Sequence, residues 1–148
     1  MKLRLKLNTD TPTSKQIILN LLHCQNLISE KLSEVLKPYD ISTEQFNVLR
    51  ILRGQKGKPI NMGTIQGKMI AKTSNTTRLV DKLLIKSLVD RAVCEKNRRK
   101  IEVTITEKGL KLLNIVDQKV EQAEKELIDP FSEAEKKQLI ELLEKFRG

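Results

Sequence analysis

The sequence predicts a mainly α-helical fold of the α+β class, with one two-stranded hairpin. Through most of the chain, apolar residues recur at spacings of three and four, as in amphipathic helices. Residues 89–94 and 101–106 instead alternate in polarity, which is the period of β-strands. The length of 148 residues fits one compact domain with helical extensions. We therefore expect a single domain over residues 1–148.

Residues 13–38 are predicted to form a long amphipathic helix. Thr13 and Gln16 have the spacing of a helix cap. Pro38 closes the segment, because proline cannot continue a helix. The apolar stripe consists of Ile17, Leu21, Cys24, Ile28, Leu32 and Val35.

Two shorter helices are expected next. Ser42 and Gln45 have the spacing of a capping box and open a helix that ends at Gly54. Asn61 is the candidate cap of the following helix, which carries Ile65.

The helix after these two has a buried side and a short polar face. Its buried side contains Leu79, Val80, Leu83 and Leu84. Small polar and basic side chains on one helix suit the major groove of DNA, where arginine and asparagine form paired hydrogen bonds with base edges. For the residues at its start, helix capping is the alternative. The candidate DNA contacts are Thr73, Ser74, Asn75, Thr76, Thr77, Arg78 and Lys82.

A basic loop, residues 95–100, joins the two predicted strands. It reads EKNRRK and contains four basic side chains and no apolar one. Such a tip on a hairpin can place arginine in a narrow minor groove, where the potential of DNA is most negative. The alternative is a charged turn that only aids solubility. The candidate contacts are Lys96, Asn97, Arg98, Arg99 and Lys100.

Residues 107–148 are predicted to form two further helices. Thr106 caps the first, and Ser132 and Glu135 form a capping box for the second. The middle of the chain is too small to cover the apolar stripes of these two helices and of residues 13–38. We expect a two-fold homodimer whose helical base is built from residues 13–38 and 107–148.

The positive charge is concentrated in the middle of the chain. The formal net charge is +9, and residues 68–100 contain 10 Lys and Arg against 3 Asp and Glu, whereas residues 107–148 contain 8 against 10. This distribution predicts binding to a polyanion. Recognition of single-stranded nucleic acid relies on aromatic side chains. With no Trp, one Tyr and three Phe, the composition favours double-stranded DNA over RNA.

Several other classes of protein are disfavoured by the sequence. It contains no P-loop, no dinucleotide-binding glycine pattern and no hydrolase nucleophile motif, so we expect no enzyme and no cofactor. The two cysteines, Cys24 and Cys94, are far apart and lack metal-binding spacing, so no metal is expected. Residues 1–7 lack the apolar core of a signal peptide, and no run of about 20 apolar residues occurs. We therefore expect a cytoplasmic protein that has no membrane partner.

The segment TSNTTRLVDKLLIKSLVDRAVCEKNRRKIEVTITEKG resembles the core of the multiple antibiotic resistance regulator (MarR) family. The resemblance lies in the order of a Thr-Arg-Leu-Val-Asp-Lys-Leu helix, a Val-x-Arg strand, a basic loop and a closing Thr-Glu-Lys-Gly. It implies a winged helix-turn-helix lobe over residues 40–106 with a two-stranded basic wing. It also implies a sequence-specific transcription regulator, expected to be a repressor, that binds a pseudo-palindromic operator as a homodimer. The family's helix function is carried over to Ser74, Asn75, Thr77 and Arg78, and its wing function to Arg98 and Arg99.

Two positions depart from the family pattern. Asn97 stands where an acidic residue usually braces the wing arginine, and Ser87 stands where glycine usually follows the reading helix. Asparagine can still accept a hydrogen bond, and serine can close a helix less comfortably than glycine.

The resemblance further implies a small-molecule effector or an oxidation step that releases the DNA. The effector's identity is unknown and no ligand-binding residues are assigned. Cys24 is a weak candidate redox sensor, and a packing role in the apolar stripe is the favoured alternative. For the whole chain, a winged-helix protein-interaction module or a nonspecific DNA-binding protein is the remaining alternative.

Overall fold

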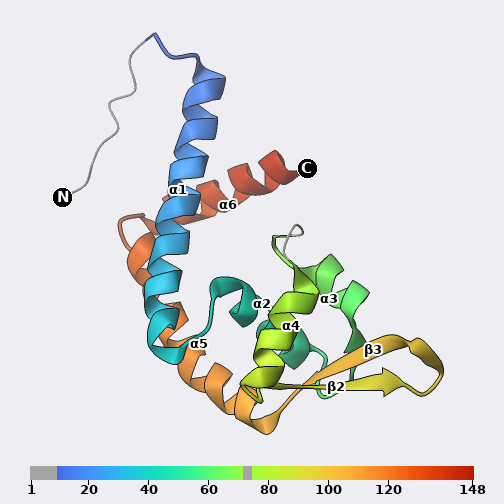
Figure 1. The fold of residues 1–148 in the computed structure, drawn as a ribbon. Coiled ribbons are helices and arrows are strands. Elements are labelled where there is room, and N and C mark those ends of the chain that lie inside the picture. Colours follow the sequence, from blue (N-terminus) through green and yellow to red (C-terminus); the bar gives the residue numbers. More distant parts are fainter. Residues whose placement is uncertain (1–9, 72–74) are drawn as a thin grey trace.

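The computed structural model describes residues 10–71 and 75–148 (Figure 1). Within these ranges it is mainly helical with a small antiparallel sheet, so the predicted fold class is confirmed. The helices are α1 (Thr13–Leu36), α2 (Thr43–Gly54), α3 (Met62–Lys68), α4 (Thr76–Ile85), α5 (Glu107–Ile128) and α6 (Glu133–Arg147), and a short 3-10 helix, η1 (Lys37–Tyr39), follows α1. The strands are β1 (Ile60–Asn61), β2 (Val89–Cys94) and β3 (Asn97–Ile105).

The start of α1 differs from the prediction. Thr13 is the first helical residue and not the cap, because Pro12 occupies the cap position and no side chain caps the helix. Gln16 bonds outside the helix instead, donating from Nε2 to the carbonyl oxygen of Thr11 at 2.7 Å. Proline lacks a side-chain acceptor, so the entry into α1 is set by its fixed φ of −56° and not by a capping hydrogen bond.

The other predicted helix starts are confirmed. Ser42 with Gln45 and Ser132 with Glu135 form complete capping boxes, in which each side chain bonds the backbone of the other residue. Asn61 caps α3, and Thr106 caps α5. These four helices therefore begin where local sequence chemistry predicts.

The sheet has three strands, not two. β1, only two residues long, pairs with β3 through Ile60 opposite Val103, giving the order β1-β3-β2. A two-residue strand is too short to show alternation, so the sequence pattern missed it.

The predicted basic loop is also shorter than expected. β3 begins at Asn97, and the register jumps from Val93 opposite Ile101 to Cys94 opposite Asn97. Residues 98–100 are thus extra residues in an irregular part of the hairpin, and only residues 95–96 form the turn. The basic side chains lie along the end of an extended strand pair.

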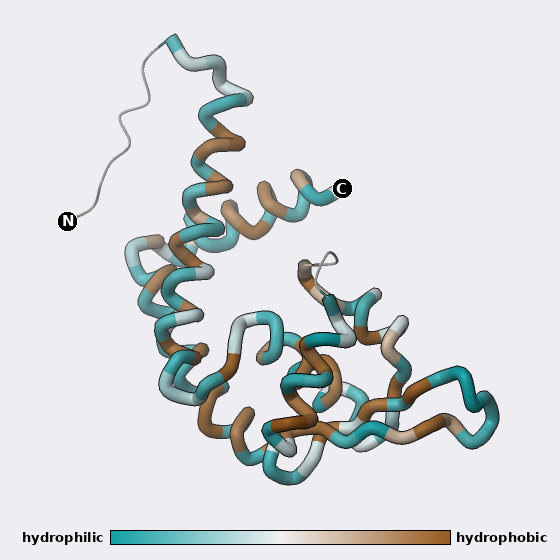
Figure 2. The backbone as a smooth tube through the Cα atoms, in the orientation of Figure 1, coloured by the Kyte–Doolittle hydropathy of each residue, from teal (hydrophilic) through white to brown (hydrophobic). Residues whose placement is uncertain are grey.

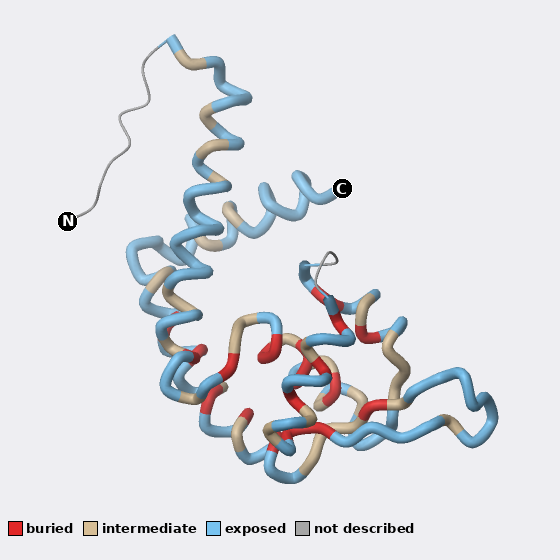
Figure 3. Tube along the Cα trace, in the orientation of Figure 1, coloured by how far each residue is buried: buried red, intermediate tan, exposed pale blue. Residues whose placement is uncertain are grey.

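The main core lies between α2, α4, the sheet and the first half of α5. Val48 and Leu49 of α2, Leu83 of α4 and Val103 of β3 are all fully buried (Figure 3). Leu113 and Val116 of α5 belong to the same cluster, as does Leu36 at the end of α1. One core therefore fixes α4 and the base of the hairpin relative to α5 and to the end of α1.

The long helices extend away from this core. In Figure 1, α1 and α6 stand off the lobe formed by α2 to β3, and the hairpin projects on the opposite side. Apolar residues on α1 and α6 remain exposed along this extension, as the hydropathy colouring shows (Figure 2). In the described ranges, no helix is long and apolar enough to cross a membrane.

Candidate nucleic-acid interface

Helix α4 presents a small polar face to solvent. Val80 and Leu83 are fully buried in the core, which turns Thr77, Arg78 and Lys82 outward. The helix begins at Asn75, whose Oδ1 accepts a hydrogen bond from the backbone N–H of Arg78 at 3.1 Å. Thr73 and Ser74, also predicted as contacts, lie outside the described residues.

Asn75 and Thr76 have structural partners. For Asn75 the capping alternative holds, and its amide nitrogen is the group left to meet a base edge. Thr76 is only 5% exposed, and its hydroxyl donates to Oε1 of Gln66 on α3. Thr76 therefore packs α4 on α3, and its burial leaves little of the side chain accessible for the predicted DNA contact. Thr76 stands four residues before Val80 and seven before Leu83, so the helical spacing of the buried side already places it inward.

The hairpin presents the second basic group. Lys96, Asn97, Arg98, Arg99 and Lys100 are all exposed, and the end of the hairpin is strongly hydrophilic (Figure 2). Oδ1 of Asn97 accepts a hydrogen bond from the backbone N–H of Arg99 at 3.1 Å. The asparagine thus braces the chain at Arg99 through its backbone, a local bond of the kind that Asn side chains form in turns.

An ion pair joins the two basic elements. Arg91 of β2 lies with Nη1 3.0 Å from Oδ1 of Asp81 on α4. Both side chains are exposed, so the pair contributes little to stability. Its consequence is geometric, because it couples the direction of the hairpin to the face of α4. The pair was not predicted, although both residues stand in the segment that resembles the MarR family.

The C-terminal end of α4 is tied down by several bonds. Nζ of Lys86 donates to the carbonyl oxygen of Asp40 and lies 3.3 Å from Oε1 of Gln45. Ser87 follows with a φ of 60°, in the left-handed region that glycine prefers. Thr106 donates from Oγ1 to the carbonyl oxygen of Ser87 at 2.7 Å. The serine therefore occupies the strained position that the family pattern gives to glycine.

Gly109 explains the end of the Thr-Glu-Lys-Gly motif. A Cβ at this position would lie 2.4 Å from the carbonyl oxygen of Leu88 and 2.7 Å from Cγ1 of Ile105. Only glycine allows α5 to pass this close to the hairpin. This motif residue is structural and does not belong to the interface.

The cysteines do not form a site with other ligands. Cys24 is exposed on α1, and Cys94 is half-buried at the end of β2. Within the part of the chain that the structure describes, no cluster of His, Cys, Asp and Glu could hold a metal ion.

Comparison with known proteins decides the family. The family model named "MarR family" matches residues 41–101. The HTH-type transcriptional regulator PecS of Dickeya dadantii is 31% identical over 119 residues, covering 79% of this chain and 71% of PecS. The chain belongs to the MarR family. The resemblance seen in the sequence is thereby confirmed.

Solved structures of MarR proteins share the whole architecture. A MarR-like transcription regulator from Bacillus cereus superposes with a TM-score of 0.83 at 25% identity, over 90% of this chain and 95% of that one. A mutant MarR from E. coli, complexed with operator DNA, superposes with a TM-score of 0.77 at 25% identity, over 92% of this chain and 99% of that one. The chain is thus a MarR family transcription regulator with the winged-helix fold.

Proposed function

We propose that this MarR protein is a sequence-specific regulator that binds double-stranded DNA through α4 and the β2–β3 hairpin. The observation that carries the proposal is the combination of an exposed polar helix face with a basic hairpin, both mounted on one core and linked at the surface by Asp81 and Arg91. A single α-helix fits the major groove, and an arginine-bearing hairpin fits the neighbouring minor groove. Where the bound site overlaps a promoter, the protein acts as a repressor by excluding polymerase.

The proposed contacts divide by role. Arg78 and Thr77 face outward on α4 and are the base-reading candidates, because arginine can form two hydrogen bonds with guanine. Thr73 and Ser74 remain candidates on sequence grounds. Phosphate and minor-groove contacts are assigned to Lys82 on α4 and to Lys96, Arg98, Arg99 and Lys100 on the hairpin.

The proposed active form is a homodimer. Large apolar side chains on α1 and α6 are between 50% and 61% exposed, and these are Ile17, Leu22, Leu27, Ile140, Leu142 and Phe146. A second copy covers them most simply, with residues 13–38 and 107–148 as the dimer base and residues 40–106 as the DNA-binding lobe. Two-fold symmetry then implies a pseudo-palindromic operator with half-sites about 34 Å apart.

The proposal also covers where the regulator acts and how it leaves DNA. The regulator acts in the cytoplasm, catalyses no reaction and needs no cofactor. A small-molecule effector or an oxidant releases it from DNA, and the exposed Cys24 thiol on α1 is the weak candidate for the oxidation.

The test compares three single substitutions on one selected duplex. Arg78→Ala should weaken binding by roughly 5- to 150-fold and relax preference at one base pair, as expected when a bidentate base contact is removed. Arg99→Ala should weaken binding to all sequences and reduce the salt dependence. Lys119→Ala removes the same charge from the exposed surface of α5 and should leave affinity unchanged.

The same preparation tests the assembly. Sedimentation equilibrium should give twice the mass of one chain for the wild type, with one dimer bound per duplex. If Arg78→Ala and Arg99→Ala both bind like the wild type at low salt, the assigned surface is wrong. If the wild type binds all duplexes equally, the nonspecific alternative holds, and if it binds none, the interaction-module alternative holds.

A further inference from the structure

A groove opens between the lower end of α1, the start of α2 and the C-terminal half of α4. Its volume is about 740 Å³. Ser42 and Gln45 line it from α2, and Lys82 and Lys86 line it from α4. Lys37, the first residue of η1, supplies a third lysine.

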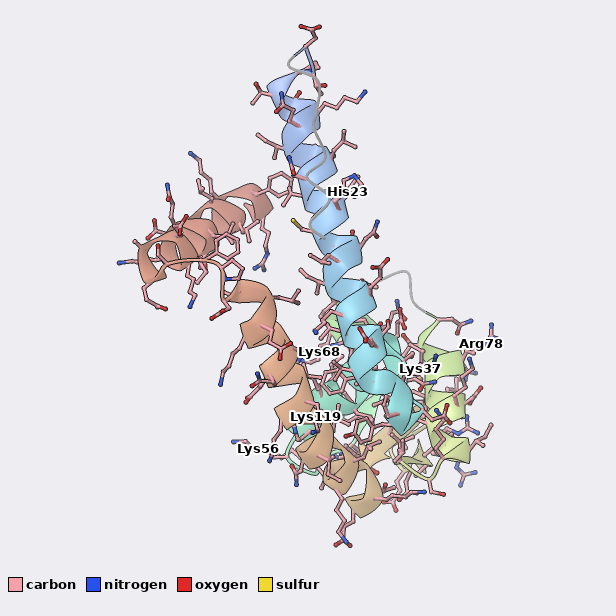
Figure 4. All side chains as sticks on the ribbon, turned by 90° about the vertical axis from the view of Figure 1, so that its left-hand side faces the viewer. His23, Lys37, Lys56, Lys68, Arg78 and Lys119 are labelled. Atoms are coloured by element: carbon pink, nitrogen blue, oxygen red, sulfur yellow. The ribbon has the colours of Figure 1, made fainter. Side chains whose placement is uncertain are left out.

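The groove continues the exposed face of α4. Arg78, Lys82 and Lys86 are spaced four residues apart, so they form one row along the helix. The row starts at the proposed base-reading end of α4 and runs into the groove. Figure 4 shows Lys37 at the lower end of α1 on the side from which Arg78 projects, whereas Lys56 and Lys119 lie on the other side.

The charge in the groove is arranged in favour of an anion. The charged residues that line it are the three lysines, Glu34 and Asp40. Asp40 is already paired, because its Oδ2 lies 3.7 Å from Nζ of Lys86. Among these lining residues, Glu34 is then the carboxylate that opposes Lys37 and Lys82. The side chains of Lys37 and Lys82 are exposed and can reach a ligand at the mouth.

Hydrogen bonds hold the backbone at the C-terminal end of α4 in place. Lys86 bonds the carbonyl oxygen of Asp40, and Lys108 donates from Nζ to the carbonyl oxygen of Lys86 at 3.0 Å. These bonds tie the end of α4 to the turn between α1 and α2, and through Lys108 to α5. The backbone segments that carry Lys37 and Lys82 are therefore connected through these bonds, while the two exposed side chains keep their rotamer freedom.

We propose that this groove holds a phosphate of the DNA backbone, contacted by Lys37 and Lys82, where the strand passes the C-terminal end of α4. The inference rests on the proposed function, since it needs α4 to lie in the major groove. It adds η1, directly after α1, to the DNA-binding surface, which the sequence confined to residues 73–100. The contact is with the backbone and carries no base preference.

The test uses a selected duplex in which single phosphates are replaced by neutral methylphosphonates, one at a time. Wild type should bind more weakly when a small set of positions in each half-site is neutralised. Lys37→Ala should bind the unmodified duplex roughly tenfold more weakly, with a salt slope lower by about 0.9 for each phosphate that the side chain no longer neutralises, or about 2 per dimer. At one phosphate position, replacement by methylphosphonate should no longer change the affinity of Lys37→Ala, although the same replacement still lowers the affinity of the Lys119→Ala control.

Glu34→Gln should have the opposite effect on DNA affinity. It removes the negative charge near Lys37 and Lys82 and should strengthen binding. Thermal melting checks that each variant is folded. If Lys37→Ala keeps the wild-type affinity, slope and methylphosphonate pattern while Arg78→Ala binds more weakly, the groove proposal fails and the proposed function stands. If Arg78→Ala also binds like the wild type, the proposed function itself fails.

Discussion

Asp81 on α4 and Arg91 on β2 form an ion pair across 3.0 Å, which links α4 to the hairpin outside the core. The pair lies on the surface, where such contacts contribute little to folding. It adds a side-chain contact between the hairpin and α4 to the core packing of Leu83 and Val89 that already places the two elements. If both elements touch the same duplex, this placement is part of the binding energy.

Asp81→Asn should therefore weaken DNA binding severalfold, although it makes the surface more positive. Simple electrostatics predicts the opposite sign, because removing a carboxylate favours binding to DNA. The free energy of unfolding should change by less than about 1 kcal/mol. The measurement is the dissociation constant for one duplex at fixed salt. Stronger binding by Asp81→Asn would show that the pair has no positioning role.

Ser87→Gly should stabilise the protein. Serine at a φ of 60° carries a cost of about 1 kcal/mol that glycine avoids. Part of the gain is offset, because glycine adds conformational entropy to the unfolded chain. We expect a net increase of about 0.5 kcal/mol in the free energy of unfolding, measured by urea denaturation at fixed protein concentration. A decrease in the free energy of unfolding would show that the serine side chain makes a bond that stabilises the fold by more than the backbone strain costs.

Gly109→Ala should destabilise the protein by about 2–3 kcal/mol, because the added methyl group meets a backbone oxygen that cannot move easily. Gly67→Ala is the matched control. It lies in helix α3 with no atom within 4 Å of an added Cβ, and it should stabilise by up to about 1 kcal/mol. Urea denaturation of both variants measures the difference. Equal effects at the two positions would contradict the close packing of α5 on the hairpin.

The capping box of α6 should make its start sensitive to acid. The backbone N–H and the hydroxyl of Ser132 hold the pKa of Glu135 below its usual value. A lowered pKa means that the carboxylate stabilises the folded state above the unfolded pKa, and that this contribution disappears as the pH falls through the folded value. The melting temperatures of wild type and Glu135→Ala should therefore converge between about pH 5 and pH 3. A constant difference over this range would exclude the ionised carboxylate as the cause.

Local chemistry explains how much of this fold the sequence predicts. Ser42, Asn61, Thr106 and Ser132 cap their helices as predicted, because a cap depends on residues only three positions apart. Tertiary contacts decide the features that were missed. Strand β1 exists only because β3 pairs with it, and β3 begins at Asn97 because the hairpin is irregular at Val93.

The candidate site divides in the same way. The exposed face of α4 follows from the apolar pattern on its buried side. The end of the hairpin has no buried side, since Val93 and Ile101 are exposed there, and its exposure depends on how far the hairpin projects from the core.

The Asn75 cap is local, because its oxygen accepts from the backbone N–H of Arg78 three residues further on. The bond between the Thr76 hydroxyl and Gln66 requires the placement of α3 against α4. The contribution of Lys37 to the groove depends on where α1 ends in space, and no sequence pattern indicates this.

The most direct test of the central claim is selection of bound duplexes from a random pool by the purified protein at near-physiological salt, followed by a salt titration on the winner. We predict that the most enriched duplex is palindromic, with two half-sites about one helical turn apart, and that affinity for it falls steeply with added salt. A pool that remains unenriched, with only weak binding that salt abolishes, would contradict a sequence-specific dimeric regulator.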